Sequence, residues 1–477
     1  MTAMLSPPDI NSSAVRTPAR DISHLHFAGD IAAARIWLTQ HIVGHAERII
    51  LSANLHSYLS WVLRVALLAE RRWQIQEAHR TPAPHNAVWI VPNSSPSVAR
   101  GIGIELMDLK QYRTSSDPIP VWEILSELHG VHQPLVTLYT SGSTGQPKGV
   151  VLTGDMIAQR MDTGASVYGF QATDLFQCRM GPDTVGGFYL PMEAWRAGAS
   201  VLCDPKLEST GHDGMPLCYH STVIMSSTTG FDNTLQLEAL WPNKSQRRVF
   251  LAGSRVHVTL ADDVFRLIAD HVYVVYGSTE CGATAHTPAV DLHKDPTSVG
   301  SVLPRVELSI LSEKGEPLPF NVQGRVAVRS PWSITAYEGD RSGSSFQNGW
   351  FLPGDLGILS PEGQLKITGR SIETLNYGGE KFVAGDLESQ ILLTPGVRDA
   401  FVTVIQHNRR ERLVIMIATN EPAVVMRRAI TSALDKKLAF TLVPVDHIPR
   451  NHMGKLNRPE LTESIAQNLR IRPFSDG

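Results

Sequence analysis

Cysteine is scarce in this sequence, and the cysteines present stand far from one another. The 477 residues include four, Cys178, Cys203, Cys218 and Cys281, without a CxxC pair or a Cys/His cluster at zinc-binding spacing. A small disulfide-stapled scaffold is therefore excluded, and structural zinc is not indicated. The same scarcity favours a reducing compartment.

An excess of charge of one sign is also missing. Lys and Arg total 43 and Asp and Glu total 46, which gives a net charge of −3, and no block of like charge interrupts the sequence. Such a chain has no general electrostatic attraction to nucleic acid or to anionic lipid. We therefore expect neither nucleic acid nor a membrane as a partner.

Long apolar runs do not occur either. The most apolar N-terminal stretch, residues 58–69, is about twelve residues long and contains Arg64, whereas a membrane-spanning helix needs about 20. Residues 1–20 are rich in Ser, Pro and Thr and lack the apolar core of a signal peptide. We expect a cytoplasmic protein whose residues 1–20 form a disordered tail.

The sequence that is present predicts an α/β protein of two domains. Apolar, β-branched runs such as residues 47–53 and 87–92 alternate with helix-like segments such as 56–74, a pattern that indicates buried strands between helices. The length of 477 residues requires at least two folded units. Turns rich in Gly and Pro are dense before residue 370, whereas the residues after it read as one compact unit. This change predicts a large α/β domain over 21–369 and a small α+β domain over 370–477.

The most informative stretch is LVTLYTSGSTGQPKGVVLT, residues 135–153. Two apolar runs, which predict strands, flank a loop rich in Gly, Ser and Thr. Its glycines let the backbone approach a ligand, and its hydroxyls and lysine can contact anionic oxygens, as a polyphosphate requires. The spacing does not fit a Walker A loop. A flexible linker remains the alternative from composition alone. The candidate phosphate-binding residues are Thr140, Ser141, Gly142, Ser143, Thr144, Gly145 and Lys148.

This loop and four later motifs resemble the adenylate-forming superfamily of acyl- and aryl-CoA ligases, adenylation domains and firefly luciferase. The motifs stand in the family's order: YTSGSTGQPKGV at 139–150, VVYGSTE at 274–280, GWFLPGDLGIL at 349–359, LKITGRSIETLNYGGEKFVAGDLE at 365–388 and IPRNHMGKLNR at 448–458. The resemblance is nearest to acyl- or aryl-CoA ligases and stand-alone acyl- or aryl-adenylating ligases. It implies a large ATP- and acid-binding domain with a small mobile lid.

The resemblance also implies roles for single residues. Lys455 on the small domain would stabilise charge during adenylation, and Thr279 would contact the α-phosphate. Glu280 would hold Mg²⁺ on the phosphates of ATP, because a carboxylate beside a triphosphate requires a hard cation. Tyr276 would stack on adenine. The remaining assignments are Asp355 and Arg370 to the ribose and α-phosphate, and Gly378 and Gly379 to the path of a pantetheine thiol.

The acid pocket and the hinge depart from the family pattern. Thr184 stands where CoA ligases often carry His and amino-acid activators carry Asp, and Asp183 is one residue away. With the register shifted by one, Asp183 could pair with a substrate ammonium. The expected pocket walls are Gly186, Gly187, Gly253 and Ser254. The hinge carries Ile372 where Asp, Lys or Ser is usual.

The function predicted from these motifs is ATP-dependent activation of a carboxylic acid as an acyl- or aryl-adenylate, followed by thioester formation on CoA or on an acyl carrier protein. One alternative is an enzyme that passes the acyl group to an amine or activates an amino acid. Another is a catalytically silent nucleotide-binding homologue, against which the retained Lys148, Glu280, Asp355, Arg370 and Lys455 argue. The sequence does not distinguish aromatic from aliphatic acids.

Overall fold

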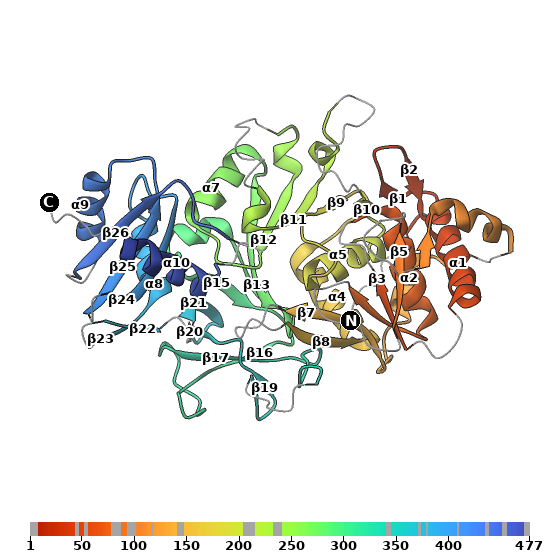
Figure 1. Ribbon diagram of the computed structural model, residues 1–477. Coiled ribbons are helices and arrows are strands. Elements are labelled where there is room, and N and C mark those ends of the chain that lie inside the picture. The colour runs from red at the N-terminus through yellow and green to blue at the C-terminus, as the bar shows by residue number, and fades with distance from the viewer. Residues whose placement is uncertain are drawn as a thin grey trace.

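The computed structural model describes residues 8–42, 47–51, 56–77, 87–92, 102–115, 118–140, 147–203, 215–231, 241–339, 345–370, 374–377, 380–407, 410–434, 438–450 and 456–471 (Figure 1). Its α-helices are α1 (His24–His41), α2 (Tyr58–Glu70), α3 (Val121–Ser126), α4 (Gly154–Tyr168), α5 (Val185–Arg196), α7 (Val258–Leu267), α8 (Ala384–Leu392), α9 (Ala423–Ala433) and α10 (Arg458–Ile471). Short 3₁₀ turns are η1 (Leu106–Ser115), η2 (Leu217–His220), η3 (Thr228–Phe231), η4 (Lys244–Gln246) and η5 (Ala289–His293).

The N-terminal sheet carries the predicted phosphate loop at one edge. Its strands are β3 (Arg48–Leu51), β4 (Gln74–Glu77), β5 (Ala87–Pro92), β6 (Ile102–Ile104), β7 (Pro134–Thr140) and β8 (Lys148–Thr153), in the order β6-β5-β3-β4-β7-β8. All neighbours pair in parallel except β7 and β8, which are antiparallel. The two strands predicted around the loop are therefore confirmed, and they pair with each other.

The second and larger sheet brings the later motifs together. Its strands are β1 (Ser13–Arg16), β2 (Asp21–Ser23), β9 (Leu175–Cys178), β10 (Ser200–Leu202), β11 (Val223–Ser227), β12 (Arg248–Ala252), β13 (His271–Ser278), β14 (Gly282–Pro288), β15 (Ser298–Val302), β16 (Glu307–Leu311), β17 (Gly324–Arg329), β18 (Phe346–Gln347), β19 (Trp350–Phe351), β20 (Asp355–Leu359) and β21 (Gln364–Arg370). Strands β9, β11, β12 and β13 are parallel neighbours. Their carboxyl ends therefore lie side by side, which is where open α/β sheets bind ligands.

A hydrophobic core joins the two sheets, and helices α4 and α5 contribute to it. It includes Trp61 of α2, Ile157 of α4, Trp195 of α5 and Leu138 of β7, all fully buried. A separate cluster, with Val264 of α7 and Leu251 of β12, packs α7 against the sheet. The helices thus hold the strand ends of the two sheets in fixed relation.

The N-terminal segment differs from its prediction. Residues 13–16 form β1, which pairs in parallel with β10, and Ala14 and Val15 are fully buried. The prediction of a disordered tail over residues 1–20 is therefore wrong at this strand. The four residues of this strand, SAVR, are too few to give a local strand signal. The strand is stabilised by pairing with β10, which begins 187 residues later in the sequence.

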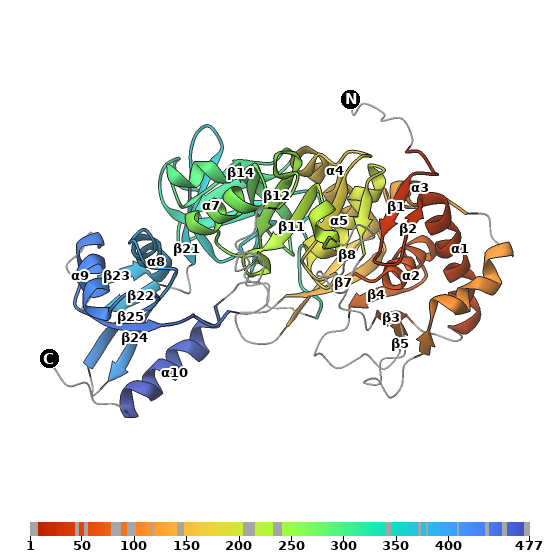
Figure 2. The same ribbon diagram turned by 90° about the horizontal axis from the view of Figure 1, so that it is seen from above.

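The C-terminal unit, residues 374–471, has its own sheets and cores (Figure 2). It contains β22 (Thr374–Tyr377), β23 (Glu380–Val383), β24 (Asp399–His407), β25 (Arg410–Ala418) and β26 (Phe440–Val445). Helices α8 and α9 pack on one hydrophobic cluster of this unit, and α10 packs on another. The strand β21 ends at Arg370, beside the boundary predicted from the sequence.

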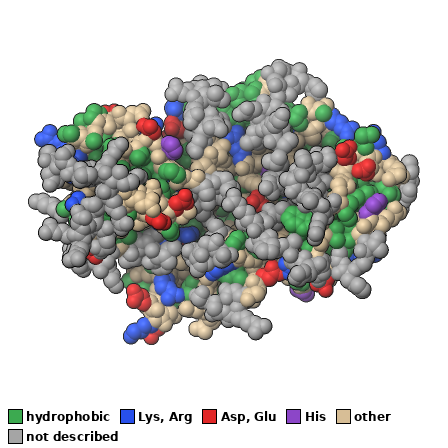
Figure 3. Space-filling view, viewed as in Figure 1, with side chains coloured by type: hydrophobic (Ala, Val, Ile, Leu, Met, Phe, Trp, Pro, Cys, Tyr) green, Lys and Arg blue, Asp and Glu red, His purple; other side chains and the backbone are tan. Residues whose placement is uncertain are grey.

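The α/β fold class is confirmed. Of the helices that the structure describes, none has the length and apolarity required to cross a bilayer. On the described part of the face in Figure 3, acidic and basic side chains are interspersed rather than gathered into one field.

Candidate active site

The ends of the predicted phosphate loop are paired across two strands. Thr140, the last residue of β7, lies opposite Lys148, the first residue of β8. Residues 141–146 lie outside the described part of the chain, so Ser141, Gly142, Ser143, Thr144 and Gly145 remain predictions. The Lys148 Nζ lies 4.7 Å from the centre of the Tyr337 ring, above its face. The ammonium therefore has a defined position before any anion arrives.

Glu280 lies in the turn between β13 and β14 and is 7% exposed. Its Oε1 accepts a hydrogen bond of 2.7 Å from the Tyr337 hydroxyl. Its Oε2 has no hydrogen-bond partner within the described ranges. A carboxylate with one oxygen held and one available suits Mg²⁺, which binds proteins through one or two carboxylates and keeps water or substrate phosphate as its other ligands.

Thr279 and Glu280 are held in place by a buried arginine. Arg160 of α4 is 3% exposed, and its guanidinium donates to the carbonyl oxygens of Thr279, Glu280 and Trp332 at 3.0, 3.0 and 3.1 Å. Burial lowers the pKa of Arg160 below its usual value. The guanidinium thus fixes the backbone of the turn that carries both candidate residues.

Asp355 and Arg370 lie opposite each other on β20 and β21 and meet Tyr276 of β13. The Tyr276 hydroxyl donates to Asp355 Oδ2 at 2.6 Å, and Arg370 Nε lies 3.0 Å from Asp355 Oδ1. Burial, with the Asp355 carboxylate as a second cause, raises the pKa of Tyr276 well above its ordinary value. The structure therefore brings together three residues that the sequence assigned to the nucleoside.

The predicted acid-pocket residues Asp183, Thr184, Gly186 and Gly187 lie at the start of α5. Thr184 is the N-cap: its Oγ1 accepts from the Gly187 backbone N–H at 3.0 Å and donates to the Gly181 carbonyl oxygen at 2.7 Å. A side chain at Gly187 would place its Cβ 1.9 Å from the Gly181 oxygen, so only glycine fits there. Capping and close packing thus explain Thr184 and Gly187 locally, as at many helix starts.

Gly253 and Ser254 follow the carboxyl end of β12. Gly253 has a φ of +91°, which favours glycine. Ser254 Oγ lies 2.7 Å from Thr228 Oγ1, just past the end of the neighbouring β11. Ser254 and Thr228 thus place two hydroxyl groups beside the carboxyl ends of β11 and β12, and the role of Gly253 and Ser254 as pocket walls stays a prediction.

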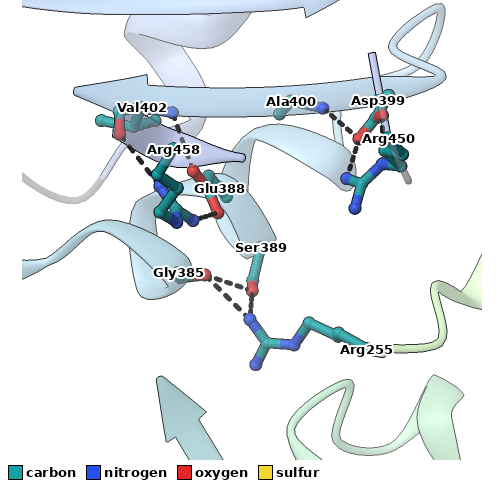
Figure 4. A network of polar contacts seen from close by, with 9 residues as sticks. All are labelled: Arg255, Gly385, Glu388, Ser389, Asp399, Ala400, Val402, Arg450 and Arg458. Atoms are coloured by element: carbon teal, nitrogen blue, oxygen red, sulfur yellow. Dashed lines mark hydrogen bonds and ion pairs between the residues drawn. The ribbon is translucent and has the colours of Figure 1, made fainter. Parts of the chain in front are cut away.

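The C-terminal unit carries candidates that lie outside the described residues, namely Lys455, Gly378, Gly379 and the hinge residue Ile372. The described residues around Lys455 are anchored. Arg450 forms two hydrogen bonds with Asp399, at 2.7 and 2.9 Å, and Arg458 donates to Glu388 Oε2 at 2.6 Å (Figure 4). Arg450 and Leu456 pair as an antiparallel bridge, which brings the two anchors together.

A model of the AMP-binding enzyme family matches residues 92–338, more than half of the chain. The chain belongs to this family. Indoleacetate–CoA ligase of Aromatoleum aromaticum is 26% identical over 357 residues, which cover 71% of this chain and 68% of that protein.

Solved structures confirm the fold of this AMP-binding enzyme. ATP-bound MatB from Rhodopseudomonas palustris has a TM-score of 0.79 at 20% identity and covers 96% of this chain and 97% of its own. The amide bond synthetase McbA from Marinactinospora thermotolerans has a TM-score of 0.78 at 18% identity and covers 95% and 97%. The family match over residues 92–338 confirms the superfamily resemblance predicted from the motifs.

Sequence reasoning missed three residues of this AMP-binding enzyme: Arg160, Tyr337 and Arg255. Arg160 and Tyr337 contact the turn at Thr279 and Glu280. Arg255 follows Ser254 and donates to the Gly385 carbonyl oxygen at 2.9 Å (Figure 4). It also donates to the Ile367 carbonyl oxygen at 3.1 Å. An arginine within the apolar pattern of α4 was the one local signal for Arg160.

Proposed function

We propose that this enzyme activates a carboxylic acid with ATP, forms an acyl- or aryl-adenylate with release of pyrophosphate, and then transfers the acyl group to the thiol of CoA. The observation that carries the proposal is the family match over residues 92–338, a range that includes both Lys148 and the turn with Thr279 and Glu280. The name of the curated relative, a CoA ligase, supports the same pair of reactions.

In this proposal one group of residues binds the phosphates of ATP and a second group binds its nucleoside. Lys148 and the loop before it bind the β- and γ-phosphates, and Thr279 contacts the α-phosphate. Tyr276 stacks on adenine, while Asp355 and Arg370 bind the ribose. A carboxylate offers about four lone-pair directions, so Asp355 can accept from ribose hydroxyls besides its present partners. These contacts align the α-phosphorus for attack by the substrate carboxylate.

Glu280 is proposed as the Mg²⁺ ligand, because its buried carboxylate has one oxygen available. The ion would neutralise charge on the phosphates of ATP. Arg160 and Tyr337 keep the Glu280 backbone and side chain in position, so the metal-binding carboxylate needs no reorganisation during the reaction.

The C-terminal unit is proposed to act as a mobile lid over residues 370–477. Lys455 would reach the carboxylate and the α-phosphate during adenylation, so that its charge is supplied where negative charge develops. After adenylation the unit would turn about the hinge at Arg370 and Ile372 and present Gly378 and Gly379 to the thiol. A glycine pair leaves room beside the backbone for a pantetheine arm.

The acceptor and the setting are finer parts of the proposal. CoA is favoured over a carrier protein as the acceptor because the relative from Aromatoleum aromaticum is named as a CoA ligase. An amine acceptor is the second candidate, since an amide bond synthetase shares the fold. We place the reaction in the cytoplasm, where ATP and CoA are available and where the four free cysteines would stay reduced.

The test is ATP–pyrophosphate exchange over a panel of aromatic and aliphatic acids, followed by an acceptor screen with CoA, a phosphopantetheinylated carrier protein and amines. Exchange that depends on one class of acid, with thioester formed on CoA, is the expected result. Exchange with amide as the product would replace the thioester step. Absence of acid-dependent exchange throughout the panel would contradict adenylation.

A further inference from the structure

A short chain segment, residues 332–338, contacts the turn that carries Glu280 and also the strand that begins at Lys148. Trp332 Nε1 donates to the Cys281 carbonyl oxygen at 2.9 Å, and Ile334 N donates to the Glu280 carbonyl oxygen at 3.0 Å. At the other end of the segment, Glu338 N donates to the carbonyl oxygen of Gly149 at 2.8 Å. Gly149 is the residue after Lys148. We call residues 332–338 the crossing segment.

Tyr337 is the residue of the crossing segment that touches both candidate side chains. Its ring lies under the Lys148 ammonium, 4.7 Å from Nζ to the ring centre, and its hydroxyl donates to Glu280 Oε1 at 2.7 Å. The side chain is 8% exposed, and Phe346 packs edge-on against the ring at 5.2 Å between centroids. One immobilised side chain thus contacts the predicted phosphate-binding cation and the predicted metal-binding anion.

The physical effect differs at the two ends of Tyr337. The ring face attracts the ammonium through its quadrupole, which favours one position of a long flexible side chain. The hydroxyl donates to one carboxylate oxygen, which orients the other oxygen for a metal ion. Without Tyr337, Lys148 and Glu280 would be drawn toward each other when ATP is absent, and a direct ion pair would occupy the groups that bind the nucleotide.

We infer that Tyr337 is a positioning residue that keeps Lys148 and Glu280 separately oriented for the phosphates and the metal of ATP. The inference rests on the proposed function. A variant that lacks only the hydroxyl loses the hydrogen bond to Glu280. A variant that lacks the whole ring also loses the contact with the Lys148 ammonium. The crossing segment itself keeps its backbone bonds and the ion pair between Glu338 and Arg48 in either case.

The variant that isolates the hydroxyl is Tyr337→Phe, and its matched control is Tyr58→Phe. Tyr58 likewise donates to a carboxylate, Asp30 Oδ2 at 2.6 Å, and neither Tyr58 nor Asp30 is a candidate phosphate-site residue. Binding of ATP to each full-length protein is measured by calorimetry over a series of Mg²⁺ concentrations and in EDTA. Near-UV circular dichroism checks that each variant is folded.

Tyr337→Phe is expected to raise the Mg²⁺ concentration for half-maximal ATP binding by about 10- to 100-fold, the usual effect of removing a partner of a metal ligand. Its affinity for ATP in EDTA stays at the wild-type value, since Lys148 keeps its ring. Tyr337→Leu is expected to weaken ATP binding in EDTA as well. In Glu280→Gln, adding Tyr337→Phe causes no further change in Mg²⁺ dependence, because the hydroxyl acts through Glu280.

Three results would overturn the role of Tyr337. The first is wild-type Mg²⁺ dependence in Tyr337→Phe. The second is an equal loss of binding with Mg²⁺ and with EDTA, which would mean a structural role alone. The third is the same shift in Tyr58→Phe. If the wild-type protein itself shows no Mg²⁺-dependent ATP binding, the proposed function fails before any variant is compared.

Discussion

At the scale of single residues, the turn at Thr279 and Glu280 depends on one buried cation. Arg160 donates to three backbone carbonyl oxygens, two of them in this turn and the third at Trp332. The bonds to Glu280 and Trp332 are buried, and a carbonyl oxygen that loses its water on folding needs a donor from within the protein. The candidate residues therefore have their backbone set by a residue that need not touch a substrate.

Replacement of this arginine by an apolar side chain of similar length tests that dependence. Arg160→Met removes this donor from the Thr279 and Trp332 carbonyl oxygens, at roughly 1–3 kcal/mol for each buried acceptor, while the Glu280 oxygen keeps the Ile334 N–H. We expect a lower midpoint of urea unfolding and a large loss of ATP–pyrophosphate exchange. The control is Arg266→Met, which removes an exposed ion pair with Asp263 and should change the midpoint little. Equal midpoints for the two variants would contradict the assignment.

At the scale of elements, the start of α2 is joined to the loop before α5 through a buried histidine. Trp61 Nε1 donates to His56 Nδ1 at 3.1 Å, so the ring hydrogen lies on Nε2, which donates to the Met180 carbonyl oxygen at 2.7 Å. Burial lowers the pKa of His56 from 6.5 to about 4. Protonation of Nδ1 would set two N–H groups against each other. The neutral ring therefore holds the loop next to the predicted acid pocket.

The folded protein should lose stability as this histidine is forced to accept a proton. Because the folded pKa lies below the unfolded value of 6.5, the stabilisation is complete above pH 6.5 and is lost as the pH falls toward 4; the difference corresponds to about 3 kcal/mol. Urea unfolding of the wild type and of His56→Gln is measured between pH 7.5 and pH 4. The variant should be less stable at pH 7.5 and should show a shallower decline. Parallel declines would refute the contribution of His56.

Local pattern predicted the elements better than it predicted their contacts. The strands β7 and β8 were predictable because apolar, β-branched runs and a glycine-rich loop are local signals. Tyr337 was not, because it lies 57 residues from Glu280, between β17 and β18, and no local pattern links the two residues. The sequence did not show why glycine stands at positions 187 and 253 of the candidate pocket. Close packing requires glycine at 187, whereas a left-handed φ favours it at 253.

At the scale of the whole molecule, Arg255 links the large sheet to the C-terminal unit. It extends from the end of β12 to the Gly385 carbonyl oxygen and also contacts Ser389, both on α8 (Figure 4). Near the end of β21, a Cβ at Gly369 would lie 2.1 Å from Cγ1 of Val383, the last residue of β23. Side-chain bonds and close backbone approach together hold the unit in the arrangement of Figures 1 and 2.

If the C-terminal unit is a lid, removing this link should free it. Arg255→Met is expected to increase the radius of gyration measured by small-angle X-ray scattering without loss of secondary structure. The matched control is Arg398→Met, since Arg398 makes two bonds of 2.9 Å within the C-terminal unit, to Asn420 and to the Asp446 carbonyl oxygen. An unchanged radius for Arg255→Met would show that Arg255 does not hold the unit in place.

The most direct test of the central claim is which bond of ATP the enzyme breaks. Purified protein is incubated with ATP, Mg²⁺, CoA and the panel of acids, and the products are identified by phosphorus NMR. Adenylation cleaves ATP at the α-phosphorus, so we predict that AMP and pyrophosphate accumulate in equal amounts with the acyl thioester, and only when a suitable acid is present. Acid-dependent formation of ADP and inorganic phosphate would contradict the account.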